Sequence, residues 1–338
     1  ADHGLPLPRS HEDAAFGLRR HGEVRAVSGL LLSTKGLSVT FHSPRGSAEA
    51  LKGADIDVAP GESLAVVGES GSGKTTLLRA SLGLVQPSAG YVALLGRKLA
   101  GCDGKELIFL RRRCGFIPQD PFGCVPPTLN ALDAASEPIR IAGRGSRGEA
   151  LEKARVLLAE LGLGDPALWK ERVRLALSGG QRQRVSIARA LSLDPEFLLA
   201  DEPASMQDAA NRAEVMAILR RRTQKGMGLL MAIHDLPLAA AFADRVAVMY
   251  KGAVVETGPS ESVVRDPLHP YSRALIAAIP GIGKEIRPPE RIEEWPFGGC
   301  PYAPRCPART ERCRKAPPLS PVAPDRNVAC WNARGRDR

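Results

Sequence analysis

A glycine-rich loop, Gly68–Thr75, carries the residues with the clearest chemical capacity; it reads Gly-Glu-Ser-Gly-Ser-Gly-Lys-Thr. Glycines allow successive backbone N–H groups to turn inward around phosphate oxygens at the start of a helix. Lys74 would reach the β- and γ-phosphates of a nucleotide, and the Thr75 hydroxyl would ligate Mg²⁺. The pattern predicts a nucleoside triphosphate site made by Gly68, Glu69, Ser70, Gly71, Ser72, Gly73, Lys74, Thr75 and Thr76.

Two further apolar runs of strand length end in groups that titrate or bind metal. Phe197–Ala200 runs into Asp201 and Glu202, and Gly228–Ile233 runs into His234. Ligands bind at the carboxyl ends of parallel strands, so Asp201 is expected to hold the Mg²⁺ shell and Glu202 to face the γ-phosphate. Glu202 would orient and polarise the attacking water, and His234 would hydrogen-bond the γ-phosphate.

A second candidate anion site follows more than 100 residues after the loop, in Leu177-Ser178-Gly179-Gly180-Gln181. Serine is a good N-cap, and the two glycines leave backbone N–H groups accessible at a helix start, where the dipole favours anions. The sequence therefore predicts two phosphate-binding helix starts that belong to different parts of the fold.

The elements that must position these residues follow an alternating pattern. The apolar run Ser63–Val67 predicts a strand before the loop, and Thr76–Leu82 predicts the first turns of a helix after it. From residue 31 to about 265, strand-like runs alternate with helical patterns, which indicates an α/β fold with a mostly parallel sheet. Within this domain, apolar residues at helical spacing between Ala150 and Leu161 mark an inserted helical subdomain at about residues 121–180.

The two ends of the chain differ in texture from this domain. Residues 1–30 carry no periodicity and are expected to form a mobile extension, without the apolar core of a secretory signal. Proline and cysteine content rises beyond Asp266, so residues 266–338 are expected to form a small separate extension.

Composition supports a globular chain without a membrane span. With 338 residues, of which 43% are hydrophobic, the chain can bury a sizeable core, and no apolar run reaches the length needed to cross a bilayer. The net charge of +10 is scattered in short clusters, which favours a solvated basic surface over a site for anionic lipid or nucleic acid. Aromatic residues make up only 4% of the chain and provide few platforms for base stacking.

These motifs, in this order, resemble the nucleotide-binding subunits of ABC transporters over nearly the whole chain. Leu177–Gln181 with the following Arg182–Leu191 looks like the signature helix of that family. The resemblance implies a P-loop NTPase fold with a RecA-like core, and ATP and Mg²⁺ as ligands. It also implies that Ser178, Gly179, Gly180 and Gln181 grip the γ-phosphate of ATP bound to a second ATPase subunit, the same chain or a sister chain.

The resemblance assigns three further residues. Gln119 looks like the glutamine that joins Thr75 and Asp201 in the metal shell and reports the nucleotide state to the membrane subunit. Asp208 closes a loop between the two ATPase subunits, although Met206 and Gln207 depart from the usual pattern there. Phe41, at the end of an expected strand over Leu37–Phe41, matches the aromatic residue that stacks on adenine; packing at a sheet edge is an equal alternative.

The tail resembles the C-terminal extension of oligopeptide, dipeptide and nickel importer ATPases, on Leu268–Pro280 and on four cysteines, Cys300, Cys306, Cys313 and Cys330. In that family such cysteines can hold a 4Fe-4S cluster. Four thiolates on a proline-rich segment with little core are suited to a metal centre, and their spacing favours iron–sulfur over zinc. Free thiols or an oxidised disulfide remain open as alternatives.

The resemblance implies an ATPase that powers import through two transmembrane permease subunits and acts indirectly with an extracytoplasmic solute-binding protein. It would lie peripherally on the cytoplasmic face of the plasma (inner) membrane, with no nucleic acid as a partner. A soluble ABC-type ATPase acting on nucleic acid or the ribosome is the alternative. It is disfavoured because Lys74 and Ser178 are separated by room only for a compact helical insert. An inactive partner subunit is disfavoured because the catalytic set Lys74, Gln119, Glu202 and His234 is complete. The transported solute, peptide or nickel or another, stays open.

Overall fold

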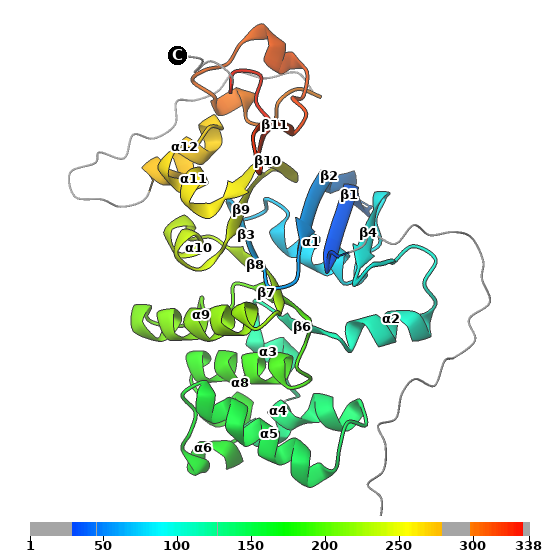
Figure 1. The fold of residues 1–338 in the computed structure, drawn as a ribbon, viewed down its shortest axis with the longest axis vertical. Helices are drawn as coiled ribbons and strands as arrows, with labels where there is room; N and C mark the ends of the chain where they lie inside the picture. The colour runs from blue at the N-terminus through cyan, green and yellow to red at the C-terminus, as the bar shows by residue number, and fades with distance from the viewer. Residues whose placement is uncertain (1–28, 45, 127, 279–297, 334–338) are drawn as a thin grey trace, which may run out of the picture.

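The computed structural model describes residues 29–44, 46–126, 128–278 and 298–333 (Figure 1). Nearly all of the extension expected at residues 1–30 lies outside the described residues, as do residues 279–297 of the tail. Among the described helices, none is both long enough and apolar enough to cross a membrane.

The central sheet is mixed, which corrects the expectation of a mostly parallel sheet. Its strand order is β11-β12-β10-β9-β3-β8-β7-β6, in which β9, β3, β8, β7 and β6 run parallel and β10, β12 and β11 are antiparallel to their neighbours. The cause is local: Lys251 and Gly252, both with positive φ, make a tight turn between β9 and β10, and a turn of that length can join only antiparallel strands. The strands are β3 (Ser63–Val67), β6 (Cys114–Ile117), β7 (Phe197–Asp201), β8 (Gly228–Ile233), β9 (Arg245–Tyr250), β10 (Ala253–Pro259), β11 (Ser320–Ala323) and β12 (Arg326–Val328).

A second, four-stranded antiparallel sheet lies beside the first, in the order β2-β1-β4-β5. The sequence did not predict this second sheet. Its long strands β1 and β2 mix buried and exposed residues and lack the continuous apolar runs seen in β3 and β8. Helix α1 (Lys74–Ser81) shares a hydrophobic core with both sheets, through Leu77 and Leu78. The strands are β1 (Leu32–Ser43), β2 (Gly46–Val58), β4 (Ala89–Leu94) and β5 (Arg97–Lys98).

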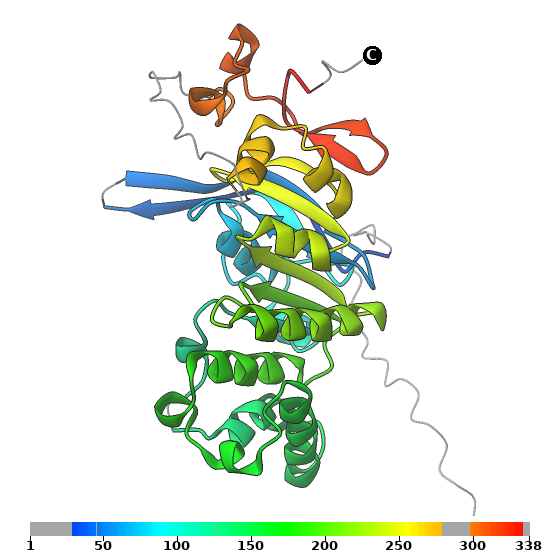
Figure 2. The same ribbon diagram turned by 90° about the vertical axis from the view of Figure 1, so that its left-hand side faces the viewer.

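A group of helices occupies the end of the long axis opposite the C-terminal segment (Figures 1 and 2). The helical spacing between Ala150 and Leu161 is confirmed as α5, which packs on α4 and α8 through Ala134, Leu158 and Val185. The helices from β5 to β7 are α2 (Gly104–Arg111), α3 (Pro121–Cys124), α4 (Ala131–Ile141), α5 (Arg147–Glu160), α6 (Pro166–Lys170), α7 (Val173–Ala176) and α8 (Gly179–Leu191).

The tail packs on the ATP-binding core instead of standing apart, since β12 pairs with β10. Glu256 on β10 is fully buried; its carboxylate accepts hydrogen bonds from Arg326, at 2.8 Å, and from the N–H groups of Leu268 and His269. One buried carboxylate therefore ties three parts of the chain together. The remaining helices are α9 (Ala209–Gln224), α10 (Leu236–Phe242), α11 (Ser260–Arg265), α12 (Pro270–Ala277) and the 3-10 turns η1 (Ala303–Arg305) and η2 (Glu311–Arg314).

Candidate active site

The glycine-rich loop runs from the buried strand β3 to the start of α1, as the sequence predicts. Two of its glycines are required by close backbone approaches. A Cβ on Gly68 would lie 2.2 Å from the Met249 carbonyl oxygen, and a Cβ on Gly73 would lie 2.5 Å from the Ala50 carbonyl oxygen. Gly73 also has a φ of 103° as the N-cap of α1, a conformation that favours glycine. The loop is thus clamped between β9 and β2.

Lys74 folds back onto its own loop. Its Nζ donates to the carbonyl oxygens of Gly68, at 2.7 Å, and Glu69, at 3.0 Å. Burial lowers the pKa of Lys74, while Glu202 and Asp201 oppose that shift. An ammonium held this way is a ready partner for a phosphate anion, which is a stronger acceptor than a carbonyl.

Asp201 and Thr75 are brought together by the parallel order of β7, β8 and β3. Asp201, the last residue of β7, is 3% exposed and hydrogen-bonds Thr75 at the start of α1. Burial raises the pKa of Asp201, and the Thr75 hydrogen bond and Lys74 counteract it. A hydroxyl beside a carboxylate offers the oxygen donors that Mg²⁺ prefers.

Glu202 has the left-handed backbone conformation, with φ 51°, which is strained for a residue with a side chain. Neighbouring hydrogen bonds hold it there: its N–H donates to the Ala232 carbonyl, at 2.9 Å, and its carbonyl accepts from Gln183 Nε2, at 2.9 Å. Such strain is concentrated at functional sites, where the surroundings fix one geometry. The role of Gln183 could not be predicted, because its position inside the signature helix does not show that its side chain reaches the loop after β7.

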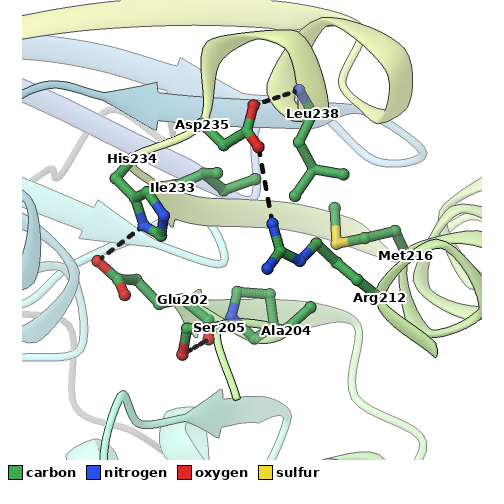
Figure 3. Close-up of a pocket in the computed structure, with 10 residues that line it drawn as sticks. Glu202, Ala204, Ser205, Arg212, Met216, Ile233, His234, Asp235 and Leu238 are labelled. Atoms are coloured by element: carbon green, nitrogen blue, oxygen red, sulfur yellow. Dashed lines mark hydrogen bonds and ion pairs between the residues drawn. The ribbon is translucent and has the colours of Figure 1, made fainter. Parts of the chain in front are cut away.

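His234 follows β8 and points at Glu202, with 3.5 Å between its Nδ1 and Glu202 Oε1 (Figure 3). The histidine side chain is 58% exposed and the glutamate only 19%. Arg212 and Asp235, 3.7 Å apart, close the far side of the same small pocket. An inner carboxylate and an outer imidazole can together hold a water molecule or a phosphate oxygen at the open face.

Gln119 and Phe41 lie at the margins of this arrangement. Ile117 of β6 pairs with Ala200 of β7, so Gln119 follows at the strand edge that carries Asp201, where its side chain is exposed. Strand β1 continues to Ser43, past the end expected at Phe41; Phe41 pairs with Ala48 of β2 and is 47% exposed. Among the described residues, neither side chain contacts Lys74, Asp201 or Glu202, and the roles of Gln119 and Phe41 remain predictions.

The second candidate anion site lies at the start of α8, and the expected serine cap is confirmed. Ser178 is the N-cap: its Oγ accepts from the Gln181 N–H, and the Gln181 side chain accepts from the Ser178 N–H at 2.9 Å. The capping box uses the N–H groups of Ser178 and Gln181. The N–H groups of Gly179 and Gly180 have no acceptor within the helix, so an anion can bind to them. The surrounding pocket is lined by these residues, Arg184 and Met206 to Asp208, and by none of the phosphate loop. Asp208 caps α9 by accepting from Asn211, which lowers the pKa of Asp208.

The four tail cysteines lie near one another. The Cys300 N–H donates to the Cys313 carbonyl at 2.8 Å, and the pKa of Cys306, raised by burial to about 11, also responds to Cys330, Cys300 and Cys313. All four are free thiols in the structure, so the disulfide alternative is not seen there. Within the described ranges, no group of three or more His, Cys, Asp or Glu side chains is arranged to hold a metal ion. The cysteines are present but are not shown to form a cluster.

Comparison with protein families gives two matches. The ABC transporter family model matches residues 51–205, and the model of the oligopeptide/dipeptide transporter C-terminal region matches residues 255–313. A "Putative peptide import ATP-binding protein" of Brucella ovis is 37% identical over 309 residues, which cover 89% of this chain and 97% of the relative. A Brucella abortus protein of the same description is 38% identical over 300 residues, covering 86% of this chain and 89% of the relative.

Comparison with solved structures also gives ATP-binding cassettes of ABC transporters. The dimeric ATP-binding cassette MJ0796, in a post-hydrolysis state with ADP and Pi, matches with a TM-score of 0.64 and 30% identity, covering 68% of this chain and 98% of the cassette. The structure of cbiO1 from Clostridium perfringens, part of the ABC transporter complex cbiONQ, matches with a TM-score of 0.61 and 26% identity, covering 71% and 92%. The mixed-sheet fold, the phosphate loop and the capped signature helix together define an ABC ATPase.

Within that class, the match at residues 255–313 narrows the assignment. The chain belongs to the oligopeptide/dipeptide transporter family of ABC transporter ATP-binding proteins. It is the ATP-binding subunit of a transporter, and the alternative of an ATPase acting on nucleic acid or the ribosome receives no support from these relatives.

Proposed function

We propose that this chain hydrolyses ATP to power the import of peptides, or of a related small solute, and that each ATP is held between two ATPase subunits. The observation that carries the proposal is the separation of the two anion sites. The pocket at the start of α8 contains no residue of the phosphate loop. One chain therefore offers two half-sites, and a second copy or a sister chain would complete each of them. The dimeric cassettes among the similar structures support this arrangement.

In this proposal Lys74 and the loop N–H groups bind the phosphates, and Glu202 orients and polarises the attacking water. His234, 3.5 Å from Glu202, fixes the geometry of that glutamate and contacts the γ-phosphate. Thr75, Asp201 and Gln119 would hold Mg²⁺, which neutralises charge on the phosphate oxygens when bound. The partner's copies of Ser178, Gly179 and Gly180 would stabilise the charge that develops on the γ-phosphate.

Coupling to transport would use the helical end of the molecule. Closure of the two subunits would move the helices around α4 and α5 and the segment at Gln119, and this surface would dock two permease subunits. The protein would then lie peripherally on the cytoplasmic face of the plasma membrane. The peptide substrate is supported by the names of the relatives and by the match to the oligopeptide/dipeptide transporter C-terminal region.

The substitution Glu202→Gln tests the proposal. It keeps the shape of the site but removes the carboxylate, so ATP should still bind while turnover falls by about a hundredfold or more. Closed dimers should accumulate with ATP, measured by light scattering after size-exclusion chromatography, and wild type under turnover is the control. Turnover close to wild type would remove Glu202 from its proposed role.

We also propose that Cys300, Cys306, Cys313 and Cys330 hold a 4Fe-4S cluster. Their mutual proximity supports this proposal, since four thiolates on a segment with little core of its own can be organised by a metal centre. In a 4Fe-4S cluster each thiolate binds a different iron, so the four sulfur atoms can lie farther apart than around a single metal ion.

Iron, zinc and acid-labile sulfide should be measured on protein purified without oxygen. The proposal expects about four irons and four sulfides per chain. It also expects their loss in Cys306→Ser but not in Cys102→Ser, because Cys102 lies in the ATPase domain. Stoichiometric zinc without sulfide, or neither metal, would contradict it.

A further inference from the structure

Glu69, the second residue of the phosphate loop, is held by the tail through two different groups. Its backbone N–H donates to the Tyr271 hydroxyl at 3.0 Å, and its carboxylate accepts from Arg305 at 3.2 and 3.4 Å. Its carbonyl oxygen accepts from Lys74 Nζ at 3.0 Å. Tyr271 and Arg305 follow Glu69 by 202 and 236 residues, so their contacts join the loop directly to the C-terminal segment.

Tyr271 is fixed in place. It is 1% exposed in the first turn of α12, where its N–H donates to His269 Nδ1 at 3.0 Å. Its ring packs 4.5 Å from the ring of Tyr250 and 5.4 Å from that of Tyr302, measured between centroids. Because the ring cannot turn away, its hydroxyl presents a fixed acceptor to the loop.

Arg305 links the loop to the cysteine segment. It lies in the turn η1, directly before Cys306, and hydrogen-bonds Tyr250 as well as Glu69. Its side chain is 31% exposed and that of Glu69 is 47% exposed, so the ion pair is a modest contact by itself. Tyr302, which packs on Tyr271, stands between Cys300 and Cys306. The cysteine segment therefore reaches the loop by both routes.

We propose that Tyr271 and Arg305 are positioning residues that hold the phosphate loop in its nucleotide-binding shape, so that the C-terminal segment sets the affinity for ATP. This inference rests on the proposed nucleotide site. A loop already ordered by Tyr271 and Arg305 loses less conformational freedom when phosphate binds, and that raises affinity. Neither residue contacts Glu202 or His234 in the described structure, so the effect falls on binding and not on the chemical step.

Tyr271→Phe removes the hydroxyl and keeps the ring. Losing one hydrogen bond should weaken nucleotide binding by about 2- to 12-fold while kcat stays near wild type. Tyr302→Phe is the matched control, since it removes a hydroxyl from the same aromatic cluster. Among the described residues, that hydroxyl has no hydrogen-bond partner. Binding of a fluorescent ADP analogue to the full chain, and KM and kcat for ATP, give the two readouts. Equal affinity in Tyr271→Phe and Tyr302→Phe would overturn the inference.

A double-mutant cycle on the Arg305–Glu69 ion pair tests whether the cysteine segment acts on the loop through this pair. Arg305→Ala and Glu69→Ala should each weaken binding, by up to about fivefold for a partly exposed pair, and the double variant should be no weaker than Glu69→Ala alone. Arg265→Ala is the control, because it breaks an exposed pair with Glu261 on α11. Additive losses would show that Arg305 does not act through Glu69, and that result would overturn this route.

Lys74→Ala separates failure of the inference from failure of the proposed site. If Lys74→Ala binds nucleotide as wild type does, the proposed site is wrong and the inference falls with it. If Lys74→Ala loses binding and Tyr271→Phe does not, the site stands and only the positioning role is lost.

Discussion

At the scale of single residues, the phosphate loop could be predicted because its chemistry is local. Lys74 contacts the carbonyl oxygens of its own loop. The backbone approaches that require Gly68 and Gly73 come from Met249 and Ala50, so the motif could be predicted but its packing could not. The contacts of Glu69 with Tyr271 and Arg305 could not be predicted, since nothing in a chain shows which tail residue returns to a loop more than 200 positions away. Gln183 was not predicted either, because its position in α8 does not show that its side chain reaches the Glu202 carbonyl, 19 residues further along.

The close approach at Gly68 gives a prediction. Gly68→Ala would put a methyl group 2.2 Å from the Met249 carbonyl oxygen, so the loop must shift and nucleotide affinity should fall by at least about tenfold, with a stability loss of about 1–3 kcal/mol. Gly104→Ala is the control, because a Cβ there has no atom within 4 Å. Isothermal titration with ADP and thermal unfolding measure the two effects. Normal ADP binding by Gly68→Ala would show that the clamp on the loop is unimportant.

At the scale of elements, strands with continuous apolar runs could be predicted and the sheet order could not. The predictions over Ser63–Val67 and Gly228–Ile233 are confirmed as β3 and β8. The antiparallel part begins with the local turn at Lys251 and Gly252, which the continuous apolar runs do not reveal. It is extended by the pairing of β12 with β10, which is long-range and could not be predicted from the chain. The same pairing makes α12 and the Glu256 carboxylate parts of one buried unit.

That unit contains a buried histidine with a consequence for pH. Burial, with a contribution from Arg273, lowers the pKa of His269 to about 4, so the native state keeps it neutral while the unfolded chain binds a proton below about 6.5. Its stabilising effect is therefore complete above about pH 6.5 and is lost as pH falls towards 4; at pH 5 the loss is about 2 kcal/mol.

His269→Asn keeps an acceptor for the Tyr271 N–H but cannot titrate. The drop in unfolding free energy between pH 7.5 and pH 5, measured by urea denaturation, should be smaller in this variant by about that amount. An equal drop in both proteins would mean that His269 is not the group that titrates.

At the scale of the whole molecule, the pocket at the start of α8 contains no residue of the phosphate loop, and the proposed function requires a second chain to join the two anion sites. The order of motifs predicted both halves, because each is a helix start with its own cap or glycines. Their separation in space comes from the helical group between β6 and β7. The sequence predicted the size of this group but not where it lies in the fold.

The most direct test of the shared site is complementation between two damaged halves. Lys74→Ala disables the loop, and Ser178→Glu puts a carboxylate where the partner's γ-phosphate would lie, so each variant alone should hydrolyse almost no ATP. In an equal mixture, random pairing gives mixed dimers with one intact site each, and the ATPase rate should recover to about one quarter of wild type. A mixture as inactive as its components, or a full rate from Ser178→Glu alone, would contradict the account.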